Sequence, residues 1–409
     1  MPIQSSVILG QLLFTLMLVG NGALFNMEHM KFLNQGDLPN GVSSRMINNG
    51  NGLDVHILQA GQRSTKNPCV LLLHGFPELA YSWRKVMVPL ADAGHYVVAP
   101  DQRGYGLTKG WTANFDGDLQ PFRMNNLIED VIGLLHALDY QEAIVVGHDF
   151  GSPVAASCAL TRPDIFRGVS LMSAPFAGFP ILSSLEEIAP VREVSDATNI
   201  HKDLSSLSVP RKHYQWYYST GAANEDMLNC PQGVHNFLRA YYHHKSADWK
   251  QNKPFPLNAW TANELAKLPK YYIMDLDQTM PQAVATEMPT ANQIENCHWL
   301  TEKELMVYSG IFKRTGFQGG LQWYRCSTKG YFEADLREFV GKAIEIPSCF
   351  IAGKNDWGVY QRPGAFETMQ SSALSDLRGC YLVENAGHWV QQEQPLDVSQ
   401  HLLRFLTTL

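Results

Sequence analysis

The chain has 409 residues, 45% of them hydrophobic and 17% charged, and this length can hold one large catalytic domain with a sizeable insertion. The formal net charge is −7 and no block of Lys or Arg stands out, which argues against a nucleic-acid partner. The seven cysteines are widely spaced, without a CxxC or Cys/His spacing, so the sequence predicts no metal site.

The first element is a short apolar segment at residues 7–19, which Gly10, Gln11 and Thr15 interrupt. It is too short to cross a bilayer, which needs about 20 residues. It has the length of a signal-peptide core and is followed by a cleavage-like Gly20-Asn-Gly, although no Lys or Arg precedes it. The role of residues 1–35 is therefore left open. They are a signal, an anchor that gives weak membrane association, or a packing helix of a cytoplasmic protein.

Strands and helices alternate after this segment. An Asn-Gly-rich turn between 45–47 and 53–58 is typical of a β-hairpin. Apolar runs of strand length then follow, with one intervening segment of helical spacing: strands at 69–73, 96–99, 143–146 and 168–172, and a helix at 125–139. Continuous apolar strands that alternate with helices predict an α/β fold, with a mostly parallel sheet covered by helices on both faces.

A long insertion interrupts this alternation. Residues 176–331 show aromatic and polar helical stretches with loops, and no strand–helix repeat. Two further apolar strands, at 349–352 and 379–383, then resume the pattern. The sequence therefore predicts a sheet domain formed by residues 36–175 and 332–409, with a mainly helical lid at 176–331 between its two parts.

The strand at 143–146 leads into Gly147-His148-Asp149-Phe150-Gly151 and a segment of small residues. A strand, a tight glycine turn and a helix are the layout of a nucleophile elbow, although the pattern alone could be a turn whose Asp caps the next helix. The usual elbow carries Ser, whereas this one carries Asp149. A carboxylate that attacks an sp³ carbon forms an ester that water can hydrolyse, whereas Ser would form an inert ether.

An acid and a histidine follow in the chain order that an elbow enzyme requires. Asp356 comes after the strand at 349–352, and His388 comes after the strand at 379–383. The carboxyl ends of the strands form the active site of an open α/β sheet. We therefore expect a triad in which His388 activates water and Asp356 orients it, although each could alone be a turn or loop residue.

The remaining groups must hold the developing charges. We expect the backbone N–H groups of Phe76 and Phe150 to form the oxyanion hole. Opening an epoxide expels an alkoxide and requires a strong donor opposite the nucleophile, whereas halide loss needs only N–H donors, often from Trp. Phe rather than Trp follows Asp149, and two tyrosines, Tyr214 and Tyr324, stand in distinctive settings within the insertion.

These motifs together resemble an epoxide hydrolase of the α/β-hydrolase superfamily. The resemblance runs from about Asn48 to the C-terminus and rests on His74-Gly-Phe-Pro-Glu with Tyr81-Ser-Trp-Arg, Asp101-x-Arg-Gly-Tyr-Gly, Gly147-His-Asp-x-Gly, Tyr214-Gln, Gln322-Trp-Tyr-Arg and Gly387-His-Trp.

The resemblance implies that Asp149 is the nucleophile, that Asp356 and His388 form the charge pair, and that Tyr214 and Tyr324 are lid donors. We also expect Trp323 and Phe150 to contact the substrate. The sequence departs from the family at Phe150, where Trp is common, and at Ser152, where Gly is common. Residues 246–293 of the lid match compact members poorly.

The leading prediction is cofactor-free hydrolysis of an epoxide to a vicinal diol, with the epoxide and water as the partners. A haloalkane or haloacid dehalogenase with the same triad is one alternative, against which the tyrosine pair argues. A catalytically dead hydrolase fold used as a ligand-binding module is another, against which the complete triad argues. The sequence leaves open which epoxide is used and whether the enzyme forms a homodimer.

Overall fold

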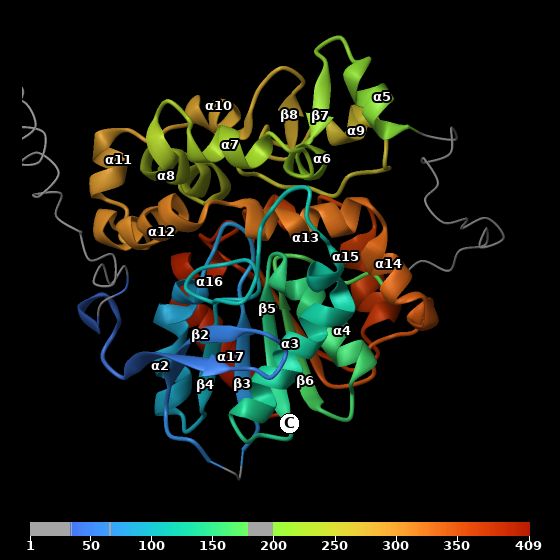
Figure 1. Ribbon diagram of the computed structural model, residues 1–409. Coiled ribbons are helices and arrows are strands. Elements are labelled where there is room, and N and C mark those ends of the chain that lie inside the picture. The colour runs from blue at the N-terminus through green and yellow to red at the C-terminus, as the bar shows by residue number, and fades with distance from the viewer. Residues whose placement is uncertain (1–32, 34, 65–66, 179–198) are drawn as a thin grey trace, which may run out of the picture. The chain divides into compact units, whose positions relative to one another are not determined.

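A computed structural model describes residues 33, 35–64, 67–178 and 199–409 (Figure 1). The chain divides into two units, 1–34 and 35–409, and the second is described here. The apolar segment at 7–19 lies outside the described residues. Within the described ranges, no helix is long and apolar enough to cross a membrane.

The second unit is built on an eight-stranded sheet with the strand order β1-β2-β4-β3-β5-β6-β9-β10. Its strands are β1 (Val42–Asn48), β2 (Asp54–Ala60), β3 (Cys69–Leu73), β4 (Val97–Pro100), β5 (Ala143–His148), β6 (Phe166–Met172), β9 (Ser348–Gly353) and β10 (Leu377–Val383). β2 runs antiparallel to β1 and β4, and the other neighbours are parallel. The predicted hairpin and mostly parallel sheet are confirmed.

The central strands β3 and β5 are buried along their whole length, on both faces of the sheet. Helices must therefore cover both faces. On one face α2 (Arg84–Asp92) packs against α17 (Pro395–Leu406). On the other, α3 (Met124–Ala137) packs against α4 (Gly151–Thr161) (Figure 1). Shorter helices line the loops after the strands: η2 (Ala80–Trp83), η3 (Gln120–Phe122), η6 (Trp357–Val359), α15 (Ala365–Thr368), η7 (Met369–Ala373) and α16 (Val390–Glu393).

Between β6 and β9 the chain forms a layer of helices beside the carboxyl ends of the strands (Figure 1). They are α5 (Ile200–Ser205), α6 (Tyr214–Tyr218), α7 (Ala223–Leu228), α8 (Gly233–Lys245), α9 (Ala262–Leu265), α10 (Met280–Ala285), α11 (Ala291–Glu295), α12 (Glu302–Thr315), α13 (Gln318–Thr328), α14 (Tyr331–Asp335) and η5 (Arg337–Phe339). The sequence predicts only helices and loops here. The structure adds an antiparallel pair, β7 (Arg211–His213) with β8 (Ile273–Asp275), whose three-residue strands are too short to show an alternating pattern.

Helix α13 approaches the sheet unit through two consecutive glycines. A Cβ atom on Gly319 would lie 2.0 Å from the carbonyl oxygen of Gly104, and one on Gly320 would lie 2.7 Å from the hydroxyl of Tyr105. Any side chain at these positions would push the helix outward. The glycine pair therefore sets how deeply α13 sits, and with it the position of Tyr324, one turn after Gly320 on the same helix face.

The chain reverses its direction across the sheet between β3 and β5. It passes from β3 through α2 to β4 on one side, and then returns through α3 to β5 on the other side of β3. The carboxyl ends of β3 and β5 are thus neighbours, with Leu73 paired beside Gly147. Open α/β sheets bind their ligands at such a switch point.

Candidate active site

Asp149 lies at the apex of the turn between β5 and α4, with a φ angle of 51°. This left-handed conformation is uncommon for a residue other than glycine. A Cβ atom on Gly147 would lie 2.1 Å from the carbonyl oxygen of Gly151, and one on Gly151 would lie 2.3 Å from that of Leu73. Only glycine fits two residues before Asp149 and two residues after it. The sharp turn presents the carboxylate of Asp149 at the edge of the sheet. Ser152 is accommodated because its hydroxyl donates to the Ala174 carbonyl at 2.8 Å.

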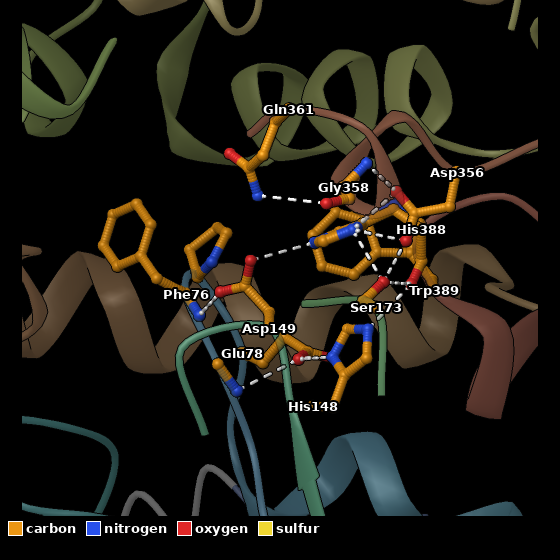
Figure 2. A network of polar contacts seen from close by, with 12 residues as sticks. Phe76, Glu78, His148, Asp149, Ser173, Asp356, Gly358, Gln361, His388 and Trp389 are labelled. Carbon is orange, nitrogen blue, oxygen red and sulfur yellow. Dashed lines mark hydrogen bonds and ion pairs between the residues drawn. The ribbon is translucent and has the colours of Figure 1, made fainter. Parts of the chain in front are cut away.

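The loop after β3 reaches this carboxylate. The backbone N–H of Phe76 donates to Oδ1 of Asp149 at 2.9 Å (Figure 2). A Cβ atom on Gly75 would lie 2.4 Å from the Asp149 side chain, so the close approach requires glycine there. The second expected donor, the N–H of Phe150, stands at the start of α4. Within the described part of the chain, no hydrogen bond joins it to Asp149 in this state.

His388 lies between Asp149 and Asp356 (Figure 2). Its Nε2 is 3.2 Å from Oδ2 of Asp149, and its Nδ1 is 3.1 Å from Oδ1 of Asp356. The contact to Asp149 is an ion pair, and Nε2 has no other polar partner among the described residues. Asp356 also accepts hydrogen bonds from the N–H of Gly358 at 2.7 Å and from the Ser173 hydroxyl.

Both carboxylates of this group are held in the ionised form. Burial by itself raises the pKa of Asp149. His388, Lys245 and His148 lower that pKa by more than burial raises it, so it lies below its ordinary value. Burial likewise raises the pKa of Asp356, and the opposing effect of His388, Ser173 and a backbone N–H again leaves it below the ordinary value. Asp149 therefore needs no base to become charged, which is what a carboxylate nucleophile requires.

Tyr214 begins α6 and Tyr324 lies in α13, and their side chains are 5% and 3% exposed. Their ring centroids are 6.0 Å apart. Burial, and then the carboxylate of Asp149, raise the pKa of both phenols well above the ordinary value, so both are neutral donors. The Tyr214 hydroxyl also donates to Gln361 at 3.3 Å and accepts from Gln215 at 3.2 Å.

Phe150 and Trp323 pack against each other beside these tyrosines. Their ring centroids are 5.5 Å apart, edge to face, and Phe150 lies 4.9 Å from the ring of Tyr324. The indole N–H of Trp323 donates to the carbonyl of Arg103 at 3.0 Å. Trp323 thus braces Phe150, and its own N–H is already engaged.

Sequence reasoning misses two residues that the structure adds to the site. Ser173 follows β6 directly with a φ angle of 68°, and its hydroxyl lies 3.1 Å from Nδ1 of His388. Its place at a strand end is the signal that could have found it.

Lys245 ends α8 and is only 2% exposed, with its ammonium 5.1–5.7 Å from the ring centroids of Tyr241, Tyr271, Tyr272 and Trp389. In sequence it resembles any basic residue at a helix end, so no local pattern shows its burial.

His148 belongs to a buried network beneath the elbow. Its Nδ1 lies 2.6 Å from Oε2 of Glu78, and its Nε2 lies 2.7 Å from the carbonyl oxygen of His388 (Figure 2). Glu78 also accepts the N–H of Gly75 at 3.2 Å. This network ties the Phe76 loop, the elbow and the His388 loop together.

Glu78→Ala should lower the free energy of unfolding by about 3–5 kcal/mol, because it leaves His148 buried without its charge partner. Urea denaturation of the variant and the wild type measures this difference. Asp164→Ala is the control: it breaks an exposed pair with Arg162 and should cost at most about 1 kcal/mol. Equal losses in the two variants would show that the buried pair does not stabilise the site.

No second site with catalytic groups is found among the described residues. A surface hollow of about 1030 Å³ is lined by residues of η3, α3 and α14, and no triad residue lies in it. Its arginines are already paired, Arg103 with Asp130, Arg123 with Asp335 and Arg162 with Asp164. Across the described residues, no group of His, Cys, Asp and Glu has the arrangement of a metal site.

The fold and the elbow geometry define a hydrolase of the α/β type, and residues 68–395 match the family described as the alpha/beta hydrolase fold. The chain is 31% identical to epoxide hydrolase B of Mycobacterium tuberculosis, over 88% of this chain and 97% of that protein. It is similar in structure to an epoxide hydrolase from an endophytic Streptomyces (30% identity, 90% and 96% of the two chains covered, TM-score 0.70) and to potato epoxide hydrolase I (27%, 90% and 100%, 0.67). The chain belongs to the epoxide hydrolase family, as the sequence motifs predict.

Proposed function

We propose that this enzyme hydrolyses an epoxide to a vicinal diol through an ester on Asp149. The observation that carries the proposal is that an ionised carboxylate and two neutral phenols belong to one cluster. The Asp149 carboxylate is held by the Phe76 N–H, and the ring of Tyr324 packs against Phe76 and Phe150 and against the ring of Tyr214. Burial and the charge of Asp149 keep both phenols neutral. A nucleophile facing two oxygen donors suits the opening of a ring ether better than the loss of a halide.

In the first step, Oδ2 of Asp149 attacks an epoxide carbon while Oδ1 keeps its hydrogen bond from Phe76. A carbon–oxygen bond of the ring breaks, and its electron pair passes to the epoxide oxygen. Tyr214 and Tyr324 donate to that oxygen as its negative charge develops, and one of them supplies a proton. The product of this step is an alkyl ester of Asp149.

In the second step, Nε2 of His388 takes a proton from water, and the hydroxide attacks the ester carbonyl carbon of Asp149. Asp356 stabilises the imidazolium that forms. The N–H groups of Phe76 and Phe150 hold the oxyanion. Collapse of this intermediate breaks the ester bond, and the proton of the added hydroxyl passes to the leaving oxygen, so that the diol is released and Asp149 is again a carboxylate. The proton on His388 returns to the tyrosinate formed in the first step, directly or through solvent.

A panel of terminal, trans-disubstituted, styrene-like and fatty-acid epoxides tests the activity and its selectivity, with chiral analysis of the diols. Matched chloroalkanes test the dehalogenase alternative in the same assay. We expect diol from at least one epoxide class, and no diol from Asp149→Asn. Halide release without diol formation from any epoxide would overturn the proposal.

The rate of ester formation should stay constant from neutral pH down to at least about pH 5. The lowered pKa keeps Asp149 ionised as the pH falls, and the acid limb should lie below the ordinary aspartate value of about 3.9. Single-turnover quench experiments across this range measure the alkylation rate. An acid limb centred above pH 5 would contradict the electrostatic account of the nucleophile.

A further inference from the structure

The loop that carries His388 is held by a carboxylate outside the triad. Glu393, at the end of α16, accepts three backbone hydrogen bonds. Its Oε1 accepts the N–H of Trp389 at 3.0 Å, and its Oε2 accepts the N–H groups of Gly387 at 2.9 Å and Ala247 at 2.8 Å. Two of these donors flank His388 in the chain, and the third belongs to the segment that follows α8.

The backbone of His388 itself is held at both of its polar groups. Its N–H donates to the carbonyl of Lys245 at 2.9 Å, and its carbonyl accepts from Nε2 of His148 at 2.7 Å. A Cβ atom on Gly387 would lie 2.5 Å from the Lys245 carbonyl oxygen, so the loop and the end of α8 touch without intervening space. Three consecutive N–H groups, from Gly387 to Trp389, are therefore fixed by Glu393 and the lid.

We propose that Glu393 is a positioning residue that holds His388 for the second step of catalysis. This step then also depends on residues 245–247, which contact Glu393 and the backbone of His388. The inference rests on the proposed two-step mechanism. Glu393 accepts these three backbone N–H groups where the loop has no ladder or helical partner. Burial raises the pKa of the Glu393 carboxyl to about 8, and the three N–H groups oppose that rise. A shift of His388 by about 1 Å can slow a reaction by roughly 10²-fold.

The first step should depend little on Glu393. An aspartate stays ionised at neutral pH even if His388 shifts and lowers its pKa less, and the Asp149 carboxylate is held by the Phe76 N–H, which comes from a different loop. Glu393 therefore separates the two steps, which a residue needed only for folding would not do.

Glu393→Gln is the direct test. The amide has the same size, but one carboxylate oxygen becomes an NH₂ group that faces a backbone N–H, so donor meets donor. Rapid-quench mass spectrometry measures how fast Asp149 is alkylated, what fraction of the protein is alkylated, and how fast the ester is hydrolysed. We expect wild-type alkylation within about twofold, and ester hydrolysis slowed at least about tenfold. In the steady state kcat and KM should then fall together.

Two further variants complete the experiment. Glu384→Gln removes an exposed carboxylate paired with Lys354 near the same loop, and it should leave both rates unchanged. If Glu393→Gln does not fold, Glu393→Asp keeps a carboxyl group with a shorter reach and should show the same selective slowing of hydrolysis.

A smaller alkylated fraction that hydrolyses at the wild-type rate would assign Glu393 a folding role only, and equal slowing of both steps would likewise overturn the proposal. Failure of the proposed mechanism itself would look different, because no variant, His388→Gln included, would then form an adduct on Asp149.

Discussion

His388→Gln should consume one equivalent of epoxide and then stop. Asp149 should stay ionised at neutral pH after the loss of His388, because Lys245, His148 and the Phe76 N–H still favour its charged form. Ester formation should therefore proceed, whereas water activation is lost and ester hydrolysis should slow by about 10²–10⁴-fold or more. Intact mass spectrometry should show the protein gaining the mass of one substrate molecule. Peptide mapping should locate the gain on the peptide that contains Asp149.

Asp149→Asn is the control for this result. Its amide is a poor nucleophile, so no adduct should form unless the amide is slowly hydrolysed back to the acid. Asp356→Asn leaves Nδ1 of His388 without its charge partner and should also accumulate ester, to a smaller extent. Normal turnover by His388→Gln, or a folded variant that never forms an adduct, would contradict the covalent mechanism.

Tyr214→Phe and Tyr324→Phe should each slow the opening of the epoxide ring. Each change removes one donor to the developing alkoxide and should cost about 2–4 kcal/mol of transition-state stabilisation, and the double variant should lose more. Presteady-state alkylation rates isolate this step. The ester, once formed, should be hydrolysed at a rate close to that of the wild type, because neither phenol takes part in water activation.

Tyr218→Phe is a matched control from the same lid helix as Tyr214. Its ring lies 5.0 Å from that of Tyr324, and its hydroxyl contacts Tyr241 rather than Gln361. Its loss should slow alkylation far less than either of the other two changes. Full activity in the double variant of Tyr214 and Tyr324 would remove the main distinction between this enzyme and a dehalogenase.

The sequence by itself determined the α/β fold, because each central strand is an uninterrupted apolar run that can be buried only in a sheet covered on both faces. It also determined the candidate triad. Asp149, Asp356 and His388 each follow such a strand, and the carboxyl ends of parallel strands meet at one edge. The observed strand bounds differ from the predicted ones by a few residues, which moves no site residue away from that edge.

Only the tertiary structure decided how this triad is supported. Ser173, Lys245 and Glu393 make their contacts with residues far away in the chain. The strand end marks only Ser173, and the local sequence around Lys245 and Glu393 shows no pattern that requires such contacts. The lid is the extreme case, since its short helices and its β7–β8 pair have no common repeat. The depth of α13 depends on Gly319 meeting Gly104. Such contacts follow from how separate elements pack, and local sequence specifies an element far more directly than its distant partner.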